Sequence, residues 1–176
     1  MNVIEYDGNK TIVELKSEID SCHGTPIAEL RILELAKHGS GIYIFYEMTD
    51  NKREYIYVGK ATSQSLAQRI AIHFDTRDDP KVAFMSGIVR KVWKTLQAGL
   101  QQPPLIDAIA HMEKMGTSLI LITFRDHKEC ARIARSLEKF LIDELKEQNT
   151  KLPKYNWRGG EAALPRDSPL KELIPI

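Results

Sequence analysis

Arg69 and His73 are the polar residues whose types and spacing most directly suggest chemistry. They lie four positions apart, beside Leu66 and Ile70, so a helix would place both on one face, one turn apart. The guanidinium is a planar set of donors suited to phosphate, and the imidazole can exchange a proton near neutral pH. Each also has an ordinary structural interpretation, as a hydrogen-bonded core histidine and as an arginine lying along the surface.

Glu138 is the second candidate, because it interrupts an apolar helical face. In the segment 129–148 apolar residues recur at helical spacing, and Glu138 falls between Ile142 and Leu145 within their arc. We therefore expect its carboxylate to be partly buried, which is costly for the ionised form without a cation or several donors. The alternative is a glutamate at the edge of the arc that reaches solvent or pairs with an arginine.

Two tyrosines lie in segments that predict a β-hairpin. Residues 41–46 and 55–58 are β-branched and aromatic, and a polar stretch with Asp50 and Asn51 separates them. We predict that Tyr43 faces Tyr57 and Phe45 faces Tyr55, with all four on one face of the sheet. The reference pKa of a tyrosine is near 10, so a catalytic tyrosine needs a nearby metal or base to lose its proton at neutral pH.

The remaining segments predict mostly helices and one further strand. The first 38 residues read as a helical extension, and 118–124 is apolar enough for a central strand. Helices are expected over 64–74, 80–98, 105–114 and 129–148, with an extended tail from Pro153. The order predicts an α+β fold, a small three-stranded, largely antiparallel sheet flanked by helices.

Composition is that of one globular domain spanning 1–176. Hydrophobic residues make up 43% and charged residues 28%, and Cys22 and Cys130 form no disulfide framework. There is no apolar stretch of the roughly 20 residues that a membrane span needs and no signal-peptide pattern, so we expect a cytoplasmic protein without membrane contact.

A net charge of +1 gives no general affinity for nucleic acid, so a nucleic-acid binder would need a local cluster of positive charge. The candidate is the basic strip, four cations without an intervening acid: Lys81, Arg90, Lys91 and Lys94. A solvated helix face is an equally good interpretation of these residues, since charge patterning alone is weak evidence.

Taken together, six positions resemble the ordered signature of the GIY-YIG nucleases, a family that includes a repair incision subunit, homing endonucleases and restriction enzymes. The two motifs of the name correspond to 41–43 and 57–59, with Val58 in place of isoleucine. The six positions are Tyr43, Tyr57, Arg69, His73, Glu138 and Asn156. The resemblance divides the chain into a core at 39–156, a helical insert at 75–117, the N-terminal extension at 1–38 and a tail at 157–176. It implies the family's β-β-α-β-α core.

The resemblance implies metal-dependent hydrolysis of phosphodiester bonds in double-stranded DNA. Glu138 would bind one Mg²⁺, with Mn²⁺ able to substitute, because Mg²⁺ tolerates a single protein ligand by keeping most of its waters. Tyr43 would act as the general base, Tyr57 would orient the attacking water, and Arg69 would neutralise the phosphate. The remaining implied roles are a hydrogen bond or proton relay for His73, electrostatic assistance from Lys60 and bracing of the site by Asn156.

Three functions remain open from the sequence. A stand-alone restriction or defence nuclease fits a chain without a recognisable second domain, and clean double-strand breaks would then require a homodimer or two sequential nicks. A nicking or structure-selective repair nuclease, acting within a larger complex, fits the near-neutral charge. A catalytically idle binding module is the third.

Overall fold

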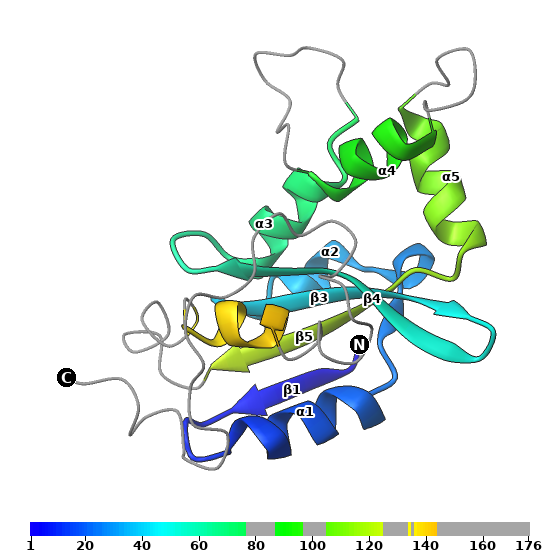
Figure 1. Ribbon diagram of the computed structural model, residues 1–176. Coiled ribbons are helices and arrows are strands. Elements are labelled where there is room, and N and C mark those ends of the chain that lie inside the picture. The colour runs from blue at the N-terminus through cyan, green and yellow to red at the C-terminus, as the bar shows by residue number, and fades with distance from the viewer. Residues whose placement is uncertain (77–86, 97–104, 125–133, 135, 144–176) are drawn as a thin grey trace.

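The computed structural model describes residues 1–76, 87–96, 105–124, 134 and 136–143. The strands are β1 (Val3–Tyr6), β2 (Thr25–Pro26), β3 (Gly41–Thr49), β4 (Lys52–Ala61) and β5 (Ser118–Phe124). The helices are α1 (Ile12–Ser21), the 3₁₀ turn η1 (Ile27–Glu29), α2 (Ile32–Leu35), α3 (Leu66–His73), α4 (Ile88–Leu96) and α5 (Ile106–Lys114). Residues 134 and 136–143 are also helical, within the predicted last helix (Figure 1).

The fold is α+β, as predicted, but the sheet is larger than expected. In the described part of the chain it has five strands, four of them in the order β1-β5-β3-β4, with the short β2 also paired to β5. β5 pairs antiparallel with β3 and parallel with β1. Its residues Leu119 to Ile122 are fully buried, as the apolar run predicted for a central strand.

The first 38 residues are not a helical extension but part of the core, which corrects the prediction. Val3–Tyr6 forms the parallel neighbour of β5, and a strand of four residues is too short to show a clear alternating pattern. Thr11 and Glu14 form a capping box that starts α1, whose Ile12, Leu15 and Ile19 are buried.

The hairpin forms where it was predicted, but its register differs. Asp50 and Asn51 both have positive φ angles, as a tight turn requires. Tyr43 faces Gly59, and Phe45 faces Tyr57, rather than the predicted partners. A β-bulge between Phe45 and Tyr46 puts one extra residue on β4 and breaks the alternation there. Tyr43, Phe45 and Tyr57 therefore belong to one core cluster, as predicted, whereas Tyr55 belongs to the other.

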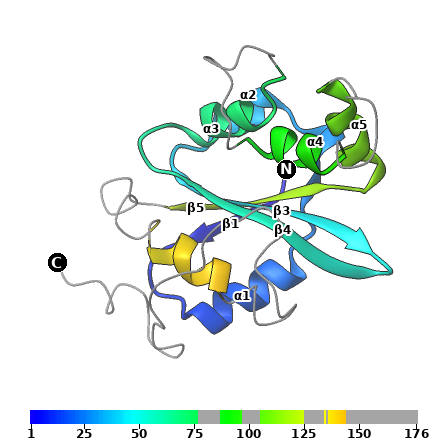
Figure 2. The ribbon, with the colours of Figure 1, turned by 45° about the horizontal axis from the view of Figure 1, so that its top comes forward.

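Helices cover both faces of the sheet (Figure 2). α1 and the helical residues 134 and 136–143 lie on one side, and α2, α3, α4 and α5 lie on the other. α4 and α5 are the described helices of the predicted insert. α5 forms where it was predicted, whereas α4 begins at Ile88 within the predicted 80–98 segment, part of which lies outside the described residues. β4 is the last strand in the order β1-β5-β3-β4 and so forms an edge of the sheet. Residues from the two helical layers can therefore meet beside β4. In the described part of the chain, no helix has the length and hydropathy of a membrane span.

Candidate active site

Two glycines of the hairpin make room for close packing at the candidate site. A Cβ atom on Gly41 would lie 2.2 Å from the carbonyl oxygen of Ile122 on β5. A Cβ atom on Gly59 would lie 2.3 Å from the hydroxyl of Tyr43, directly across the hairpin. The glycine of the second motif is therefore required by the ring of the first motif's tyrosine.

α3 holds Arg69 and His73 on its inner side. The helix begins with a capping box in which the Ser65 hydroxyl accepts a hydrogen bond from the backbone of Gln68 and Gln68 bonds back. Leu66 and Ile70 are buried beneath the helix. Arg69 and His73 share its face one turn apart, as their spacing predicted.

His73 is buried, at 1% exposure, and its tautomer follows from its two partners. The backbone N–H of Ile88 at the start of α4 donates to Nδ1 at 3.1 Å. Burial, together with the positive charges of Arg69 and Lys91, lowers the pKa of His73 to about 3, so the ring is neutral at physiological pH. A neutral ring that accepts at Nδ1 carries its proton on Nε2, and His73 therefore donates to the Tyr43 hydroxyl at 2.6 Å.

Tyr43 is fully buried and accepts hydrogen bonds from two residues. Besides His73, Arg69 Nε donates to its hydroxyl oxygen at 3.3 Å. The Tyr43 hydroxyl therefore donates its own hydrogen bond to the hydroxyl oxygen of Tyr57. The two rings stack at a centroid distance of 6.1 Å. The hydrogen bonds therefore run from His73 through Tyr43 to Tyr57.

Burial raises the pKa of both tyrosines, but their surroundings differ. For Tyr43, burial and the neighbouring Tyr57 raise the pKa, and Arg69 opposes them. For Tyr57, burial raises the pKa, whereas Arg69 and the hydrogen bond from Tyr43 lower it. Tyr57 is 8% exposed, and the negative charge of Glu138 raises its pKa further. Tyr57 is therefore the tyrosine nearer to the carboxylate and to solvent.

Beside these tyrosines lies a pocket of about 270 Å³ that gathers three predicted residues. Lys60 from the end of β4, Arg69 from α3 and Glu138 line it, together with residues 61–64. The Glu138 side chain is 17% exposed and forms an ion pair with Lys60, so it is partly buried as predicted, with a lysine rather than an arginine as partner. The pocket thus joins residues from both helical layers at the edge of the sheet.

The donor set of this pocket suits a hard cation that keeps its own waters. Among the described residues no group of three or more His, Cys, Asp or Glu side chains could hold a metal ion. Glu138 is the carboxylate that lines the pocket, and it offers oxygen, the donor that Mg²⁺ prefers. The pocket therefore fits one Mg²⁺ with a single protein ligand and does not resemble a closed structural metal site.

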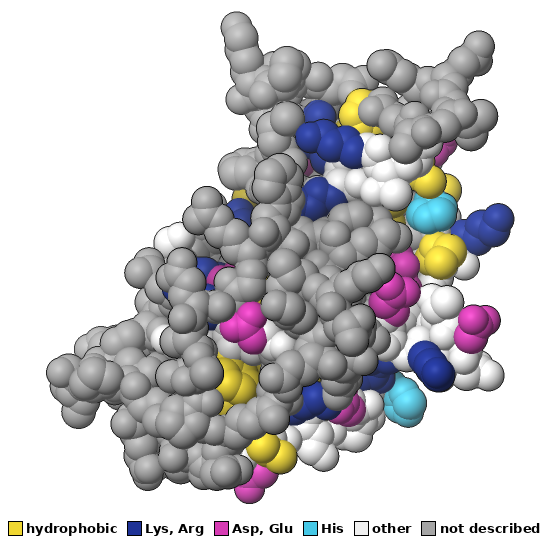
Figure 3. Space-filling model, viewed as in Figure 1, with side chains coloured by type: hydrophobic (Ala, Val, Ile, Leu, Met, Phe, Trp, Pro, Cys, Tyr) yellow, Lys and Arg dark blue, Asp and Glu magenta, His cyan; other side chains and the backbone are white. Residues whose placement is uncertain are grey.

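The residues predicted to contact nucleic acid do not form a single exposed patch among the described residues. Arg90 is buried at 8% exposure, because it lies on the inner side of α4, while Lys94 is exposed. Lys91 lies against the site, with Nζ 4.6 Å from the centroid of the Tyr57 ring. Lys and Arg side chains are visible at the α4 end of the molecule in Figure 3. Lys81 and Asn156 lie outside the described residues.

The contact between Lys91 and Tyr57 was not predicted from the sequence. A usable signal was present, because Lys91 follows Ile88 by three positions and therefore lies on the same side of a helix as that apolar residue. α4 therefore contributes both a backbone donor to His73 and a cation to Tyr57.

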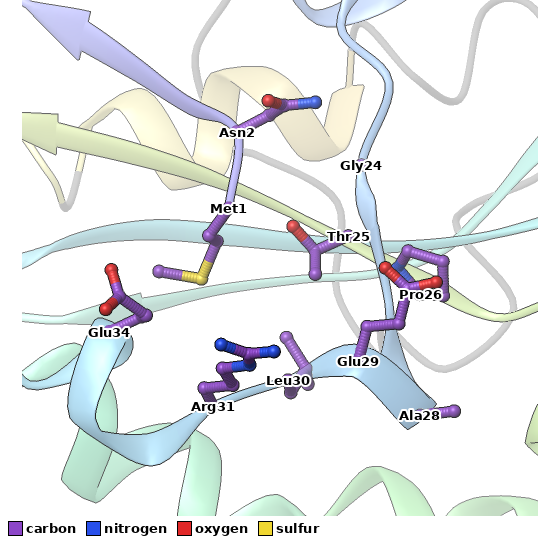
Figure 4. Close-up of a pocket in the computed structure, with 10 residues that line it drawn as sticks. All are labelled: Met1, Asn2, Gly24, Thr25, Pro26, Ala28, Glu29, Leu30, Arg31 and Glu34. Carbon is purple, nitrogen blue, oxygen red and sulfur yellow. The ribbon is translucent and has the colours of Figure 1, made fainter.

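A larger pocket, of about 710 Å³, lies away from these residues (Figure 4). It is lined by the start of the chain and by residues between 24 and 34. Its charged side chains are mixed, with Arg31 between Glu29 and Glu34. None of the predicted site residues lines it.

Comparison of this chain with protein-family models, with curated proteins and with solved structures finds no match. Its function is therefore inferred from the side chains gathered at the edge of β4.

Proposed function

We propose that this protein is a metal-dependent endonuclease that hydrolyses phosphodiester bonds of double-stranded DNA with one Mg²⁺, as the GIY-YIG nucleases that it resembles do. The observation that carries the proposal is the convergence of Lys60, Arg69 and Glu138 on one pocket. Lys60 and Glu138 are 78 positions apart, and Arg69 is hydrogen-bonded to the buried Tyr43. A carboxylate can hold a metal ion, and a guanidinium can neutralise the charge that develops on a phosphate.

Glu138 is the residue that would hold the metal. When bound, Mg²⁺ would polarise the phosphate and lower the pKa of a coordinated water. Lys60 forms an ion pair with Glu138, and both side chains line the pocket. The lysine is then placed to support the negative charge that develops on the phosphate oxygens.

Arg69 connects the pocket to the tyrosines. Its Nε bonds to Tyr43, which fixes the plane of the guanidinium, and the side chain also lines the pocket. A guanidinium held in this way can donate to a phosphate oxygen through its other nitrogens. Arg69 therefore would bind the scissile phosphate and orient the tyrosine pair at the same time.

The hydrogen bonds favour Tyr57 rather than Tyr43 as the group that takes the proton from water. Tyr43 is fully buried and donates a hydrogen bond to Tyr57. Tyr57 would first release its own proton to solvent, and Tyr43 and Arg69 would stabilise the resulting phenolate, which then accepts the proton of the attacking water. His73 has no lone pair available for a proton relay, because Nδ1 accepts from Ile88 and Nε2 carries the proton. In this scheme His73 and Tyr43 hold the Tyr57 side chain in position, and the Tyr57 hydroxyl faces the attacking water.

The test is incubation of the purified protein with supercoiled plasmid, with Mg²⁺ and with a chelator, followed by sequencing of the product ends. We expect Mg²⁺-dependent cleavage with ends at one short sequence, as for a stand-alone restriction or defence nuclease. Nicked circles without such a sequence would point instead to a repair-type nuclease. Absence of cleavage by natively folded protein would contradict the proposal and favour a binding module.

A further inference from the structure

Two cations of different helices meet at the Tyr57 ring. Lys91 of α4 places Nζ 4.6 Å from the ring centroid. Arg69 of α3 is hydrogen-bonded to the hydroxyl of the same tyrosine. α3 and α4 are in direct contact, so the two charges are held by packed helices rather than by loops.

The surroundings of Lys91 disfavour its positive charge. Burial and the neighbouring Arg69 lower the pKa of Lys91 to about 8. The positive charges of Arg69 and Lys91 also lower the pKa of His73. Two cations this close to one ring would both attract a bound anion.

We propose that Lys91, next to Arg69, forms a binding subsite for a second phosphate of the DNA strand, adjacent to the scissile phosphate that Arg69 binds. This inference rests on the proposed function for the identity of the polyanion, and on the structure for the site itself. Arg69 lines the pocket together with Glu138, and Lys91 Nζ lies 4.6 Å from the centroid of the Tyr57 ring. A strand with one phosphate in the pocket would place a neighbouring phosphate at Lys91.

The subsite explains why α4 belongs to the site. The N–H of Ile88 fixes the tautomer of His73, and Lys91 lies one turn further along the same helix. A phosphate bound by Lys91 would hold α4 against the tyrosines. Binding of the flanking phosphate would thereby keep the imidazole in the orientation in which it donates to Tyr43.

The experiment is titration of the metal-free protein with inorganic pyrophosphate, which offers two adjacent phosphates, by isothermal calorimetry at low ionic strength. Lys91→Met keeps the length of the side chain and removes the charge, and Lys91→Arg restores the charge. Lys114→Met, on the exposed side of α5, is the control for net charge. We expect Lys91→Met to weaken binding tenfold or more, since a charge-assisted contact is lost. We expect Lys91→Arg to recover most of the affinity and Lys114→Met to leave it unchanged.

The subsite is refuted if wild-type protein does not bind pyrophosphate, or if Lys91→Met and Lys114→Met have equal effects. These outcomes are separate from failure of the nuclease proposal. Lys91-dependent binding by a protein that leaves plasmid uncut would preserve the anion site and remove the hydrolase. Plasmid cleavage by a protein whose pyrophosphate binding does not depend on Lys91 would preserve the nuclease proposal and refute the subsite.

Discussion

Replacement of Tyr43 by Phe tests the buried hydrogen-bond network with the removal of a single oxygen atom. The hydroxyl accepts from His73 Nε2 at 2.6 Å and from Arg69 Nε at 3.3 Å. Without it the Nε2–H of a fully enclosed imidazole has no acceptor, which costs about 1–3 kcal/mol of unfolding free energy. Arg69 is only partly buried and can donate to water instead, so the loss of its hydrogen bond to Tyr43 adds little to this cost.

The effect on catalysis is expected to exceed the effect on stability. Tyr43 donates to the oxygen of Tyr57, so its removal destabilises the phenolate that would accept the proton from water. We expect the cleavage rate to fall by about 10²- to 10⁴-fold, the usual range for general acid–base groups. The assay combines urea unfolding with single-turnover cleavage of supercoiled plasmid at saturating Mg²⁺.

Tyr55→Phe is the matched control on the same hairpin. Its hydroxyl donates to Asp20 at 2.6 Å in the opposite core cluster, so the substitution also removes one hydrogen bond from a buried ring. We expect a loss of about 1–3 kcal/mol from this bond to a charged group, with an unchanged cleavage rate. Equal cleavage rates of the two variants would refute the assignment of Tyr43 to the site, because both lose one buried hydroxyl.

Three further predictions concern the supports of the site. Gly59→Ala drives a Cβ to 2.3 Å from the Tyr43 hydroxyl, so we expect a loss of about 1–3 kcal/mol in thermal or urea unfolding together with reduced cleavage; unfolding at the wild-type midpoint would contradict the packing described. Arg53→Met removes donors to two carbonyls at the end of α1, at 2.5 and 2.8 Å, and should cost about 1–3 kcal/mol while leaving cleavage unchanged. Lost cleavage at wild-type stability would exclude this purely structural role. Burial lowers the pKa of His73 from 6.5 to about 3, so between these pH values the unfolded chain binds a proton at this residue and the folded chain does not. As the pH falls through this range, the free energy of unfolding should decrease by up to about 1.4 kcal/mol per pH unit. If the decrease from pH 7 to pH 5 were the same in His73→Gln as in the wild-type protein, this assignment would be contradicted.

Local patterns were sufficient to predict most elements around the site. The apolar spacing on α3 and the apolar run of β5 are signals carried by neighbouring residues, and both elements form where they were predicted. Glu138 was identified because a carboxylate interrupts an apolar face, and the structure confirms its partial burial. These signals need no knowledge of the rest of the chain.

The features that the sequence did not reveal depend on contacts between distant segments. β1 is a strand because β5 provides hydrogen-bond partners, and its four residues carry too little pattern to show this. The bulge between Phe45 and Tyr46 shifts the register further, so that Tyr43 faces Gly59, where a Cβ atom would meet its hydroxyl. The spacing from Ile88 places Lys91 on the inner side of α4, but its approach to Tyr57 depends on how α4 packs on α3.

The most direct measurement of the central claim is the single-turnover cleavage rate of supercoiled plasmid by wild-type protein and by Glu138→Gln at saturating Mg²⁺. The amide keeps the shape of the side chain and its place beside Lys60 but removes the charge that would hold the metal. We predict at least about a hundredfold loss of rate, comparable to the loss of one electrostatic group at a reacting phosphate, with a native circular dichroism spectrum. Mg²⁺-dependent cleavage by Glu138→Gln at the wild-type rate would contradict the account.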